Sequence, residues 1–168
     1  GQCLYGNLLF NPLIPEANNL VAANFWLQKA ANQLCPRANT LLADRYFYGM
    51  YGFQKNLQEA AKLYELPASL GNSWSQMQLG TIYYTSHNYQ LAVKWLEMAA
   101  KAGESAAQNL LGKCYQNGNG VAKNLEEAVK WYTASANQGN EDGKHNLGVC
   151  YYYGWGVEKD KKYAKQLG

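Results

Sequence analysis

The sequence has little charge and no long apolar run. Charged residues make up 16% of its 168 residues, and 15 Lys and Arg against 12 Asp and Glu leave a net charge of +3. This balance lacks the excess of positive charge that is typical of a nucleic-acid-binding surface. A membrane-spanning helix needs about 18 or more consecutive apolar residues, and no such run occurs. We therefore expect neither nucleic acid as a partner nor direct membrane insertion.

Groups that could form a catalytic or metal site are also scarce. The chain has only two histidines, His87 and His145, and its four cysteines show no Cys-x-x-Cys spacing, which argues against a zinc site. The paired glycines near residues 118–120 and 154–156 lack the Gly-Lys-Ser/Thr that a phosphate-binding loop requires. The sequence thus predicts no catalytic residue, no metal ligand and no cofactor.

What the sequence does contain is a repeat of 32–37 residues. Its first pattern is Leu, a small residue and, three residues later, Tyr, with small residues at Ala43, Gly80, Gly112 and Gly148 and a degenerate copy at Gly6. Its second pattern, Asn or Asp four residues before Ala, has its alanines at Ala22, Ala60, Ala92, Ala128 and Ala164. Two patterns that run in step indicate a structural repeat.

Each repeat is predicted to form two helices. Apolar residues at i, i+1 and i+4 indicate one buried face of a first helix, and a Gly six residues after the small position, such as Gly118, is expected to end it. The second helix is expected to begin at the Asn or Asp, as at Asn56 and Asn124, because this side chain can accept from the exposed first-turn amides. No strand-like alternation occurs. The sequence therefore predicts an all-α solenoid.

The unit Leu-Gly-x-x-Tyr-x-x-Gly-x-Gly-Val, followed by Asn or Asp and Ala-x-x-Trp-x-x-x-Ala with a terminal Gly, resembles the Sel-one-like repeat (SLR) family. This family is a longer-looped relative of the tetratricopeptide repeat. The resemblance implies a right-handed superhelical α-solenoid of stacked antiparallel helix pairs, and we expect a segment of a larger, bacterial protein. One domain is expected over residues 1–168, with repeats at 1–35 (degenerate), 36–71, 72–103, 104–139 and 140–168 (truncated).

Two repeats depart from this pattern. The third has a shortened loop, Thr85-Ser86-His87-Asn88, which predicts a different turn. The second carries Pro67 inside its second helix, which predicts a kink or an early stop.

The resemblance implies an adaptor that holds a partner protein or peptide on its concave surface, which the first helices line. By register, the groove is predicted to comprise Arg37, Thr40, Asp44, Phe47, Trp74, Met77, Thr81, Tyr84, Asn109, Lys113, Gln116, His145 and Tyr152. This mixture of aromatic, amide and singly charged side chains is typical of binding hot spots. We predict a non-enzymatic interaction scaffold, with a virulence or host-interaction role as one use. A bacterial envelope, secreted or host-directed location is favoured over the bacterial cytoplasm.

Two alternatives stay open. Exposed Tyr and Trp could bind carbohydrate or cell wall, and His145 with Asp44 could form a hydrolase site. The cysteines bear on the compartment. Cys3 is expected near the start of the first helix and Cys35 near the end of its antiparallel partner, so a disulfide between them is predicted, and it would favour export. Cys114 and Cys150 are predicted to be buried, unpaired side chains.

Overall fold

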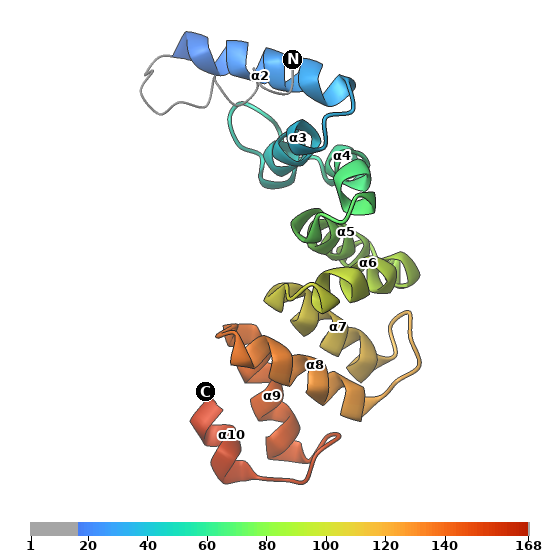
Figure 1. The fold of residues 1–168 in the computed structure, drawn as a ribbon. Helices are drawn as coiled ribbons and strands as arrows, with labels where there is room; N and C mark the ends of the chain where they lie inside the picture. The colour runs from blue at the N-terminus through green and yellow to red at the C-terminus, as the bar shows by residue number, and fades with distance from the viewer. Residues whose placement is uncertain (1–16, 168) are drawn as a thin grey trace. The chain divides into compact units, whose positions relative to one another are not determined.

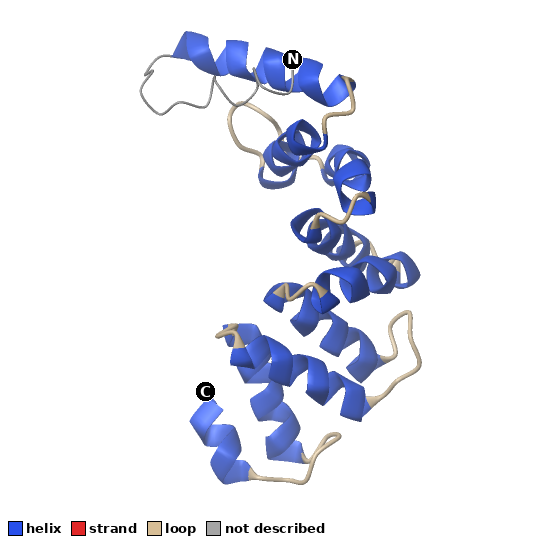
Figure 2. Ribbon diagram, viewed as in Figure 1, coloured by secondary structure: helices blue, strands red, loops and turns tan. Residues whose placement is uncertain are grey.

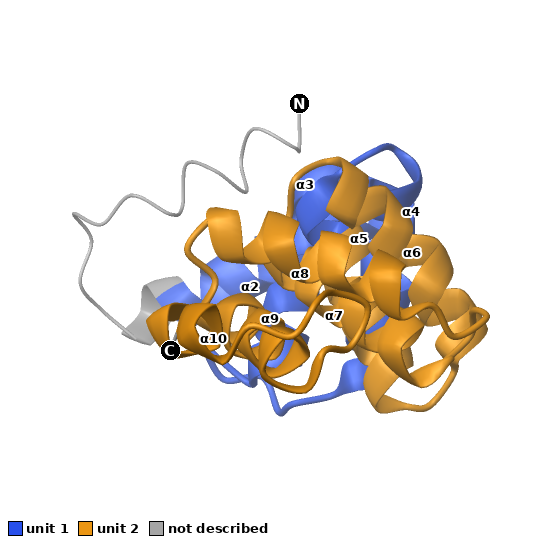
Figure 3. Cartoon of the chain, turned by 90° about the horizontal axis from the view of Figure 1, so that it is seen from below, with its two compact units in different colours: residues 1–75 blue, residues 76–168 orange. Residues whose placement is uncertain are grey.

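The computed structural model describes residues 17–167, and this range contains nine helices and no strand (Figures 1 and 2). The helices are α2 (Ala17–Asn32), α3 (Pro36–Tyr48), α4 (Leu57–Ser69), α5 (Ser73–Thr85), α6 (Tyr89–Lys101), α7 (Ser105–Asn117), α8 (Leu125–Asn137), α9 (Glu141–Tyr153) and α10 (Lys161–Leu167). Within each unit, helices that follow one another in the chain pack together, as α3 does with α4 and α7 with α8, which confirms the predicted all-α solenoid of helix pairs. The chain divides into two compact units, residues 1–75 and 76–168 (Figure 3).

The predicted glycine stops of the first helices are confirmed. Gly49, Gly118 and Gly154 follow α3, α7 and α9 in the left-handed region, with φ of 68°, 76° and 78°. The N–H of Gly118 donates to the carbonyl oxygen of Cys114, which satisfies one of the free carbonyls at the helix end. Glycine suits these positions because a side chain is strained at positive φ.

The predicted asparagine caps of the second helices are confirmed in two repeats and wrong in one. The side chain of Asn56 accepts from the N–H groups of residues 58 and 59 at the start of α4, and that of Asn124 accepts from the N–H of residue 127 at the start of α8. Asn88 makes no side-chain cap to α6. Its repeat has the shortened loop, whose turn is indeed different: His87 takes a left-handed φ of 61°. Asn88 then lacks the extended backbone that an N-cap side chain needs.

The first unit packs α2, α3 and α4 around an alanine-rich core. Its cluster of buried residues is Leu27, Ala30, Ala31, Cys35, Ala38 and Leu42. The early stop expected at Pro67 is wrong, because α4 continues to Ser69 and has 13 residues, as α3 does. Pro67 is fully buried, and the apolar surface that its ring buries offsets the backbone hydrogen bond that it cannot donate.

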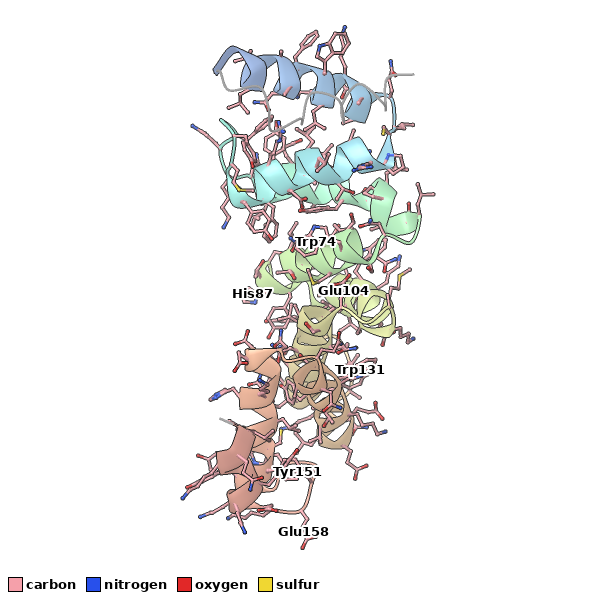
Figure 4. The ribbon with its side chains drawn as sticks, turned by 60° about the vertical axis from the view of Figure 1, so that its left-hand side comes forward. Trp74, His87, Glu104, Trp131, Tyr151 and Glu158 are labelled. Carbon is pink, nitrogen blue, oxygen red and sulfur yellow. The ribbon has the colours of Figure 1, made fainter. Side chains whose placement is uncertain are left out.

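The second unit packs α6 to α10 and the greater part of α5 in the same way. Trp131 on α8 packs against the core cluster formed by α5, α6 and α7, and Tyr151 on α9 packs against the next cluster, which includes Ala128 and Tyr132 (Figure 4). Large side chains of the second helices lie directly on the small residues of the first. Leu96 lies on Gly80 and Tyr132 on Gly112, so the two helices of a pair approach closely.

The cysteines differ in state. Cys114 and Cys150 are free thiols and are buried in the second unit, as predicted. Burial raises the pKa of each thiol to about 11. Cys35 is buried in the first unit and is not a free thiol. Cys3 lies outside the described residues, so the pairing of Cys3 with Cys35 stays a prediction.

Candidate functional site

In the first unit, two of the predicted groove residues line a cleft at one edge of the α3–α4 pair. Arg37 and Thr40 lie on the first turns of α3, opposite the end of α4. The cleft has a volume of about 680 Å³ and is lined by Pro36, Arg37, Thr40, Leu41, Pro67, Leu70, Gly71 and Asn72; we call it the Arg37 cleft. Its apolar wall and its exposed guanidinium group suit a peptide with an apolar side chain and an acidic group.

The carboxylate of Asp44 ties two aromatic residues of the first unit together. Its Oδ1 accepts from the hydroxyl of Tyr64 at 2.5 Å and from the indole N–H of Trp74 at 3.0 Å. Tyr64 is fully buried, whereas Trp74, at the start of α5, stays 38% exposed (Figure 4). Phe47 packs edge-on against Tyr64, with 6.4 Å between ring centroids. Trp74 is thus held in one orientation with part of its ring open to solvent.

In the second unit, two of the predicted groove residues are buried. Met77 is 7% exposed and belongs to the core cluster of α5 to α7. Asn109 is 4% exposed, and its side-chain oxygen accepts from the amide of Asn146 at 2.7 Å, which ties α7 to α9. Neither side chain offers accessible surface to a partner. Register identifies the helix face on which a residue lies, but not how deeply the next helix covers it.

Other predicted residues of the second unit are half-buried and held by polar contacts. The side-chain oxygen of Gln116 accepts from the hydroxyl of Tyr132 at 2.6 Å. Tyr84 packs edge-on against Tyr89, with 5.5 Å between ring centroids, and burial raises the pKa of its hydroxyl. Thr81 donates to the carbonyl of the preceding turn, and Lys113 is half-buried. These residues form a partly accessible, largely uncharged face.

His145 and Tyr152 line a second cavity, between α9 and α10. It has a volume of about 320 Å³ and is lined by Lys144, His145, Gly148, Val149, Tyr152, Tyr153, Ala164 and Lys165; we call it the Gly148 pocket. Aromatic rings extend along its edge. The ring of Tyr153 stacks on Trp155, with centroids 5.1 Å apart and an interplanar angle of 21°.

The two residues of the hydrolase alternative belong to different compact units. Asp44 belongs to the first unit and His145 to the second, so the two do not form a pair within one packed unit. The Nδ1 of His87 lies 2.8 Å from the hydroxyl of Tyr89. Across residues 17–167, no three His, Cys, Asp or Glu side chains gather closely enough to hold a metal ion. Within the same range, no helix combines the length and the apolar character needed to cross a membrane.

The sequence prediction missed residues on both helices of a pair, among them Leu41 and Val149 on first helices and others at or just after second helices. Pro67 and Leu70 line the Arg37 cleft, while Ala164 and Lys165 line the Gly148 pocket. The prediction considered first helices only.

Comparison with known proteins shows the same repeat. The sequence model of the Sel1 repeat matches residues 1–33, 36–72, 75–104, 105–140 and 142–167. No curated protein matches the chain.

Three solved structures are similar. A protective antigen, c5321, that is present in uropathogenic Escherichia coli strains and displays an SLR fold is 33% identical, with a TM-score of 0.84 over 99% of this chain and 36% of the other. A Sel1 repeat protein from Oxalobacter formigenes is 32% identical, with a TM-score of 0.84 over 99% of this chain and 67% of the other. Helicobacter pylori cysteine rich protein B is 27% identical, with a TM-score of 0.52 over 68% of this chain and 90% of the other. The chain therefore spans about a third of the length of the E. coli antigen.

Proposed function

Because the chain belongs to the Sel1 repeat family, whose members are known as protein–protein interaction modules, we propose that it is a non-catalytic scaffold that binds a partner protein or peptide on its first helices. One observation carries this proposal: each compact unit has a cavity lined by residues that repeat register assigned to the binding surface. These are Arg37 and Thr40 in the first unit and His145 and Tyr152 in the second.

Within this proposal the residues have different roles. Trp74 and Tyr84 supply apolar anchors, because both are aromatic and partly accessible, and such rings dominate binding energy at protein interfaces. Arg37, Lys113 and His145 supply polar orientation at the rim. Met77 and Asn109 are left out, because their side chains are buried within the second unit.

One of the similar structures is described as a protective antigen present in uropathogenic Escherichia coli strains. On the strength of this similarity we extend the proposal to an exported, host-facing role. The predicted disulfide between Cys3 and Cys35 agrees with this compartment, since disulfides persist in oxidising environments.

The test is affinity capture with mass spectrometry, with bacterial and eukaryotic lysates used separately. A Trp74→Ala, Tyr84→Ala double variant is compared with wild type and with a Leu91→Ala, Met98→Ala double variant. Leu91 and Met98 are matched controls, because both are exposed apolar residues on the second helix α6. Circular dichroism and thermal unfolding verify that all three chains are folded.

We expect one protein to be enriched by wild type and by the control but lost with the Trp74→Ala, Tyr84→Ala variant. Full retention of that protein by the folded Trp74→Ala, Tyr84→Ala variant would remove these first-helix faces as the binding surface. A hydrolase screen of wild type against His145→Ala tests the non-catalytic part of the proposal. Activity that disappears in His145→Ala would overturn that part.

A second candidate is carbohydrate binding, which the stacked Tyr153 and Trp155 rings favour. Tyr153 is 57% and Trp155 38% exposed, so a flat aromatic surface is open to solvent, and such surfaces stack on sugar rings. Pull-down with peptidoglycan, using wild type beside Trp155→Ala, separates this candidate from the first. Retention that requires Trp155 would favour it, and no retention would exclude peptidoglycan as the ligand.

A further inference from the structure

Asp44 carries a carboxylate at the predicted groove register of the first unit, and only neutral donors hold it. Its Oδ1 accepts from the Tyr64 hydroxyl at 2.5 Å and from the Trp74 indole N–H at 3.0 Å. Asp44 is half-buried, and no donor among residues 17–167 bonds to its Oδ2. The ion pairs in this part of the chain join lysines to glutamates three residues away, and none involves Asp44. Neutral donors orient a carboxylate but leave its charge in place.

The buried hydroxyl of Tyr64 does not require a charged acceptor. Tyr132 has the same register in the second unit, four residues after the repeated Ala, and is also fully buried. Its hydroxyl donates to the neutral side-chain oxygen of Gln116 at 2.6 Å. A neutral oxygen therefore satisfies a buried tyrosine of this repeat. The charge of Asp44 exceeds what the packing of Tyr64 needs, and it is available to a ligand.

Aromatic rings lie beside this carboxylate. Phe47 and Tyr48 stand three and four residues after Asp44, on the same side of α3, and their rings meet edge-on with 4.8 Å between centroids. Trp74, which Asp44 fixes through the indole N–H, is 38% exposed, and Tyr48 is 48% exposed. The face of an aromatic ring attracts a cation within about 6 Å. A carboxylate beside partly open rings therefore favours a positively charged group.

The two arginines of α3 leave this position open. Arg45 follows Asp44 directly, but it is buried, and its guanidinium group lies over the ring of Tyr51, 5.1 Å from the centroid. Arg37 lines the Arg37 cleft seven residues before Asp44, which is about 10 Å along the helix axis. Physiological salt screens exposed charges beyond about 8 Å, so Arg37 repels a cation at Asp44 only weakly.

We propose that Asp44 and Trp74 bind the side chain of a lysine or arginine in a partner peptide. The cationic end of that side chain meets Oδ2 of Asp44, and its methylene chain lies on the ring of Trp74. This inference rests on the proposed function, that the partner is a protein, and it adds the kind of residue that the partner must present. Trp74 then supplies apolar contact, and Asp44 selects for positive charge.

The first experiment is a selection of displayed random peptides on the full chain, with wild type and Asp44→Asn used side by side. Asparagine keeps a side-chain oxygen that can accept from Tyr64 and Trp74, but it removes the charge. We expect the peptides selected on wild type to share a lysine or arginine at one aligned position. Those selected on Asp44→Asn should lack this preference, because nothing else at the position favours a cation.

The second experiment measures the pair directly. One selected peptide is dye-labelled, and a matched peptide has norleucine, which lacks the charge, in place of the shared basic residue. Fluorescence anisotropy then gives the affinity of both peptides for both chains, which is a double-mutant cycle. We expect norleucine to weaken binding to wild type at least about fivefold and binding to Asp44→Asn less than about twofold.

Glu65→Gln is the matched control, because it makes the same change in net charge at an exposed residue of α4. It should keep the full effect of norleucine. Thermal unfolding verifies that both variants are folded. The norleucine peptide tests the charge without any change to the chain, so the comparison stands even if Asp44→Asn is less stable.

Several results would overturn the inference. These are a failure to select any peptide on wild type, selected peptides with no shared basic residue, and an equal effect of norleucine on wild type and folded Asp44→Asn. An equal loss in Glu65→Gln would assign the effect to net charge and not to this site. Failure here is distinguishable from failure of the proposed function. A partner whose capture requires Trp74 and Tyr84 but not the charge of Asp44 sustains that function and overturns this inference.

Discussion

The ring of Tyr132 occupies the space in which a side chain on Gly112 would stand, since a Cβ there would lie 2.6 Å from Cε1 of the ring. Leu96 bears the same relation to Gly80. Real Cβ atoms do not approach other atoms so closely. Glycine is therefore needed at these helical positions because it lets the two helices of a pair lie close together. The small residue of the repeat pattern is thus the point where the two helices of a pair touch.

This relation predicts opposite effects of one substitution at two equivalent positions. Gly112→Ala should lower the free energy of unfolding by about 2–3 kcal/mol, because Tyr132 must move within a packed core. Gly148→Ala should leave it unchanged or raise it by up to about 1 kcal/mol, because alanine favours the helix and nothing obstructs its Cβ. Urea unfolding of both full-length variants, followed by circular dichroism, checks this. Equal losses at both positions would contradict it.

The loop glycines predict a second contrast. Gly120 has a φ of +73°, and a Cβ there would lie 2.4 Å from the carbonyl oxygen of Tyr89, at the start of α6. Gly139 has a φ of +82° but nothing within 4 Å. Gly139→Ala should therefore cost about 1–2 kcal/mol, from backbone strain alone. Gly120→Ala should lower the free energy of unfolding clearly more, because the loop must also move away from the backbone of Tyr89 to make room for the Cβ.

Thermal unfolding of Gly120→Ala and Gly139→Ala, measured side by side, distinguishes the cost of backbone strain at positive φ from the cost of a steric clash with α6. Similar unfolding temperatures for the two variants would mean that the added Cβ at Gly120 causes no costly clash with α6. The equivalent pair one repeat later, Gly156 and the carbonyl oxygen of Leu125 at 2.3 Å, offers a replicate.

The contact between Asp44 and Tyr64 predicts an energetic coupling. The buried hydroxyl of Tyr64 donates to Asp44, so Asp44→Ala leaves it without this acceptor and should cost about 1–3 kcal/mol. In a Tyr64→Phe background the same substitution should cost less, because no hydroxyl remains to be satisfied. A double-mutant cycle by urea unfolding gives the coupling, and additive losses would contradict the prediction.

Much of the fold was predictable because its signals are local. Glycine caps such as Gly118 and asparagine caps such as Asn124 depend on backbone angles and on one side chain, so the sequence reveals them directly. The early stop at Pro67 and the side-chain cap at Asn88 were predicted wrongly, for reasons that lie outside these residue types. Burial keeps Pro67 inside α4, and the left-handed turn at His87 removes the backbone angles that Asn88 needs to cap α6.

The candidate site was less predictable, because the burial of a side chain depends on how neighbouring helices pack over it. Register places Asn109 and His145 at the same position of their repeats. Asn109 is nevertheless buried against Asn146 of the following first helix, whereas His145 is exposed and lines the Gly148 pocket.

The four cysteines predict a simple count of reactive thiols. Cys114 and Cys150 are buried, and burial raises the pKa of both, so the folded chain should react slowly with a disulfide reagent at pH 8. Unfolding in guanidinium without reductant should expose two thiols, and reduction first should expose four, if Cys3 and Cys35 are paired. Four thiols in the unreduced, unfolded chain would contradict the disulfide.

The same two thiols make the second unit less stable at alkaline pH. Burial raises the pKa of Cys114 and of Cys150 from 9.0 to about 11. Below pH 9 both thiols are protonated in the folded and unfolded chain, so their full contribution to stability is present. As the pH rises from about 9 to about 11, the unfolded chain loses these protons while the folded chain keeps them, and the free energy of unfolding falls.

The loss should reach at most about 3 kcal/mol for each thiol. Buried tyrosines act in the same direction, because burial also raises the pKa of Tyr132 and of Tyr84. Urea unfolding at several pH values from 8 to 11 measures the slope for wild type and for a Cys114→Ala, Cys150→Ala variant. The variant should start less stable, because two buried side chains are truncated, but should lose less stability per pH unit. A slope equal to that of wild type would mean that the two thiols do not ionise on unfolding, and that the tyrosines alone set the alkaline limit.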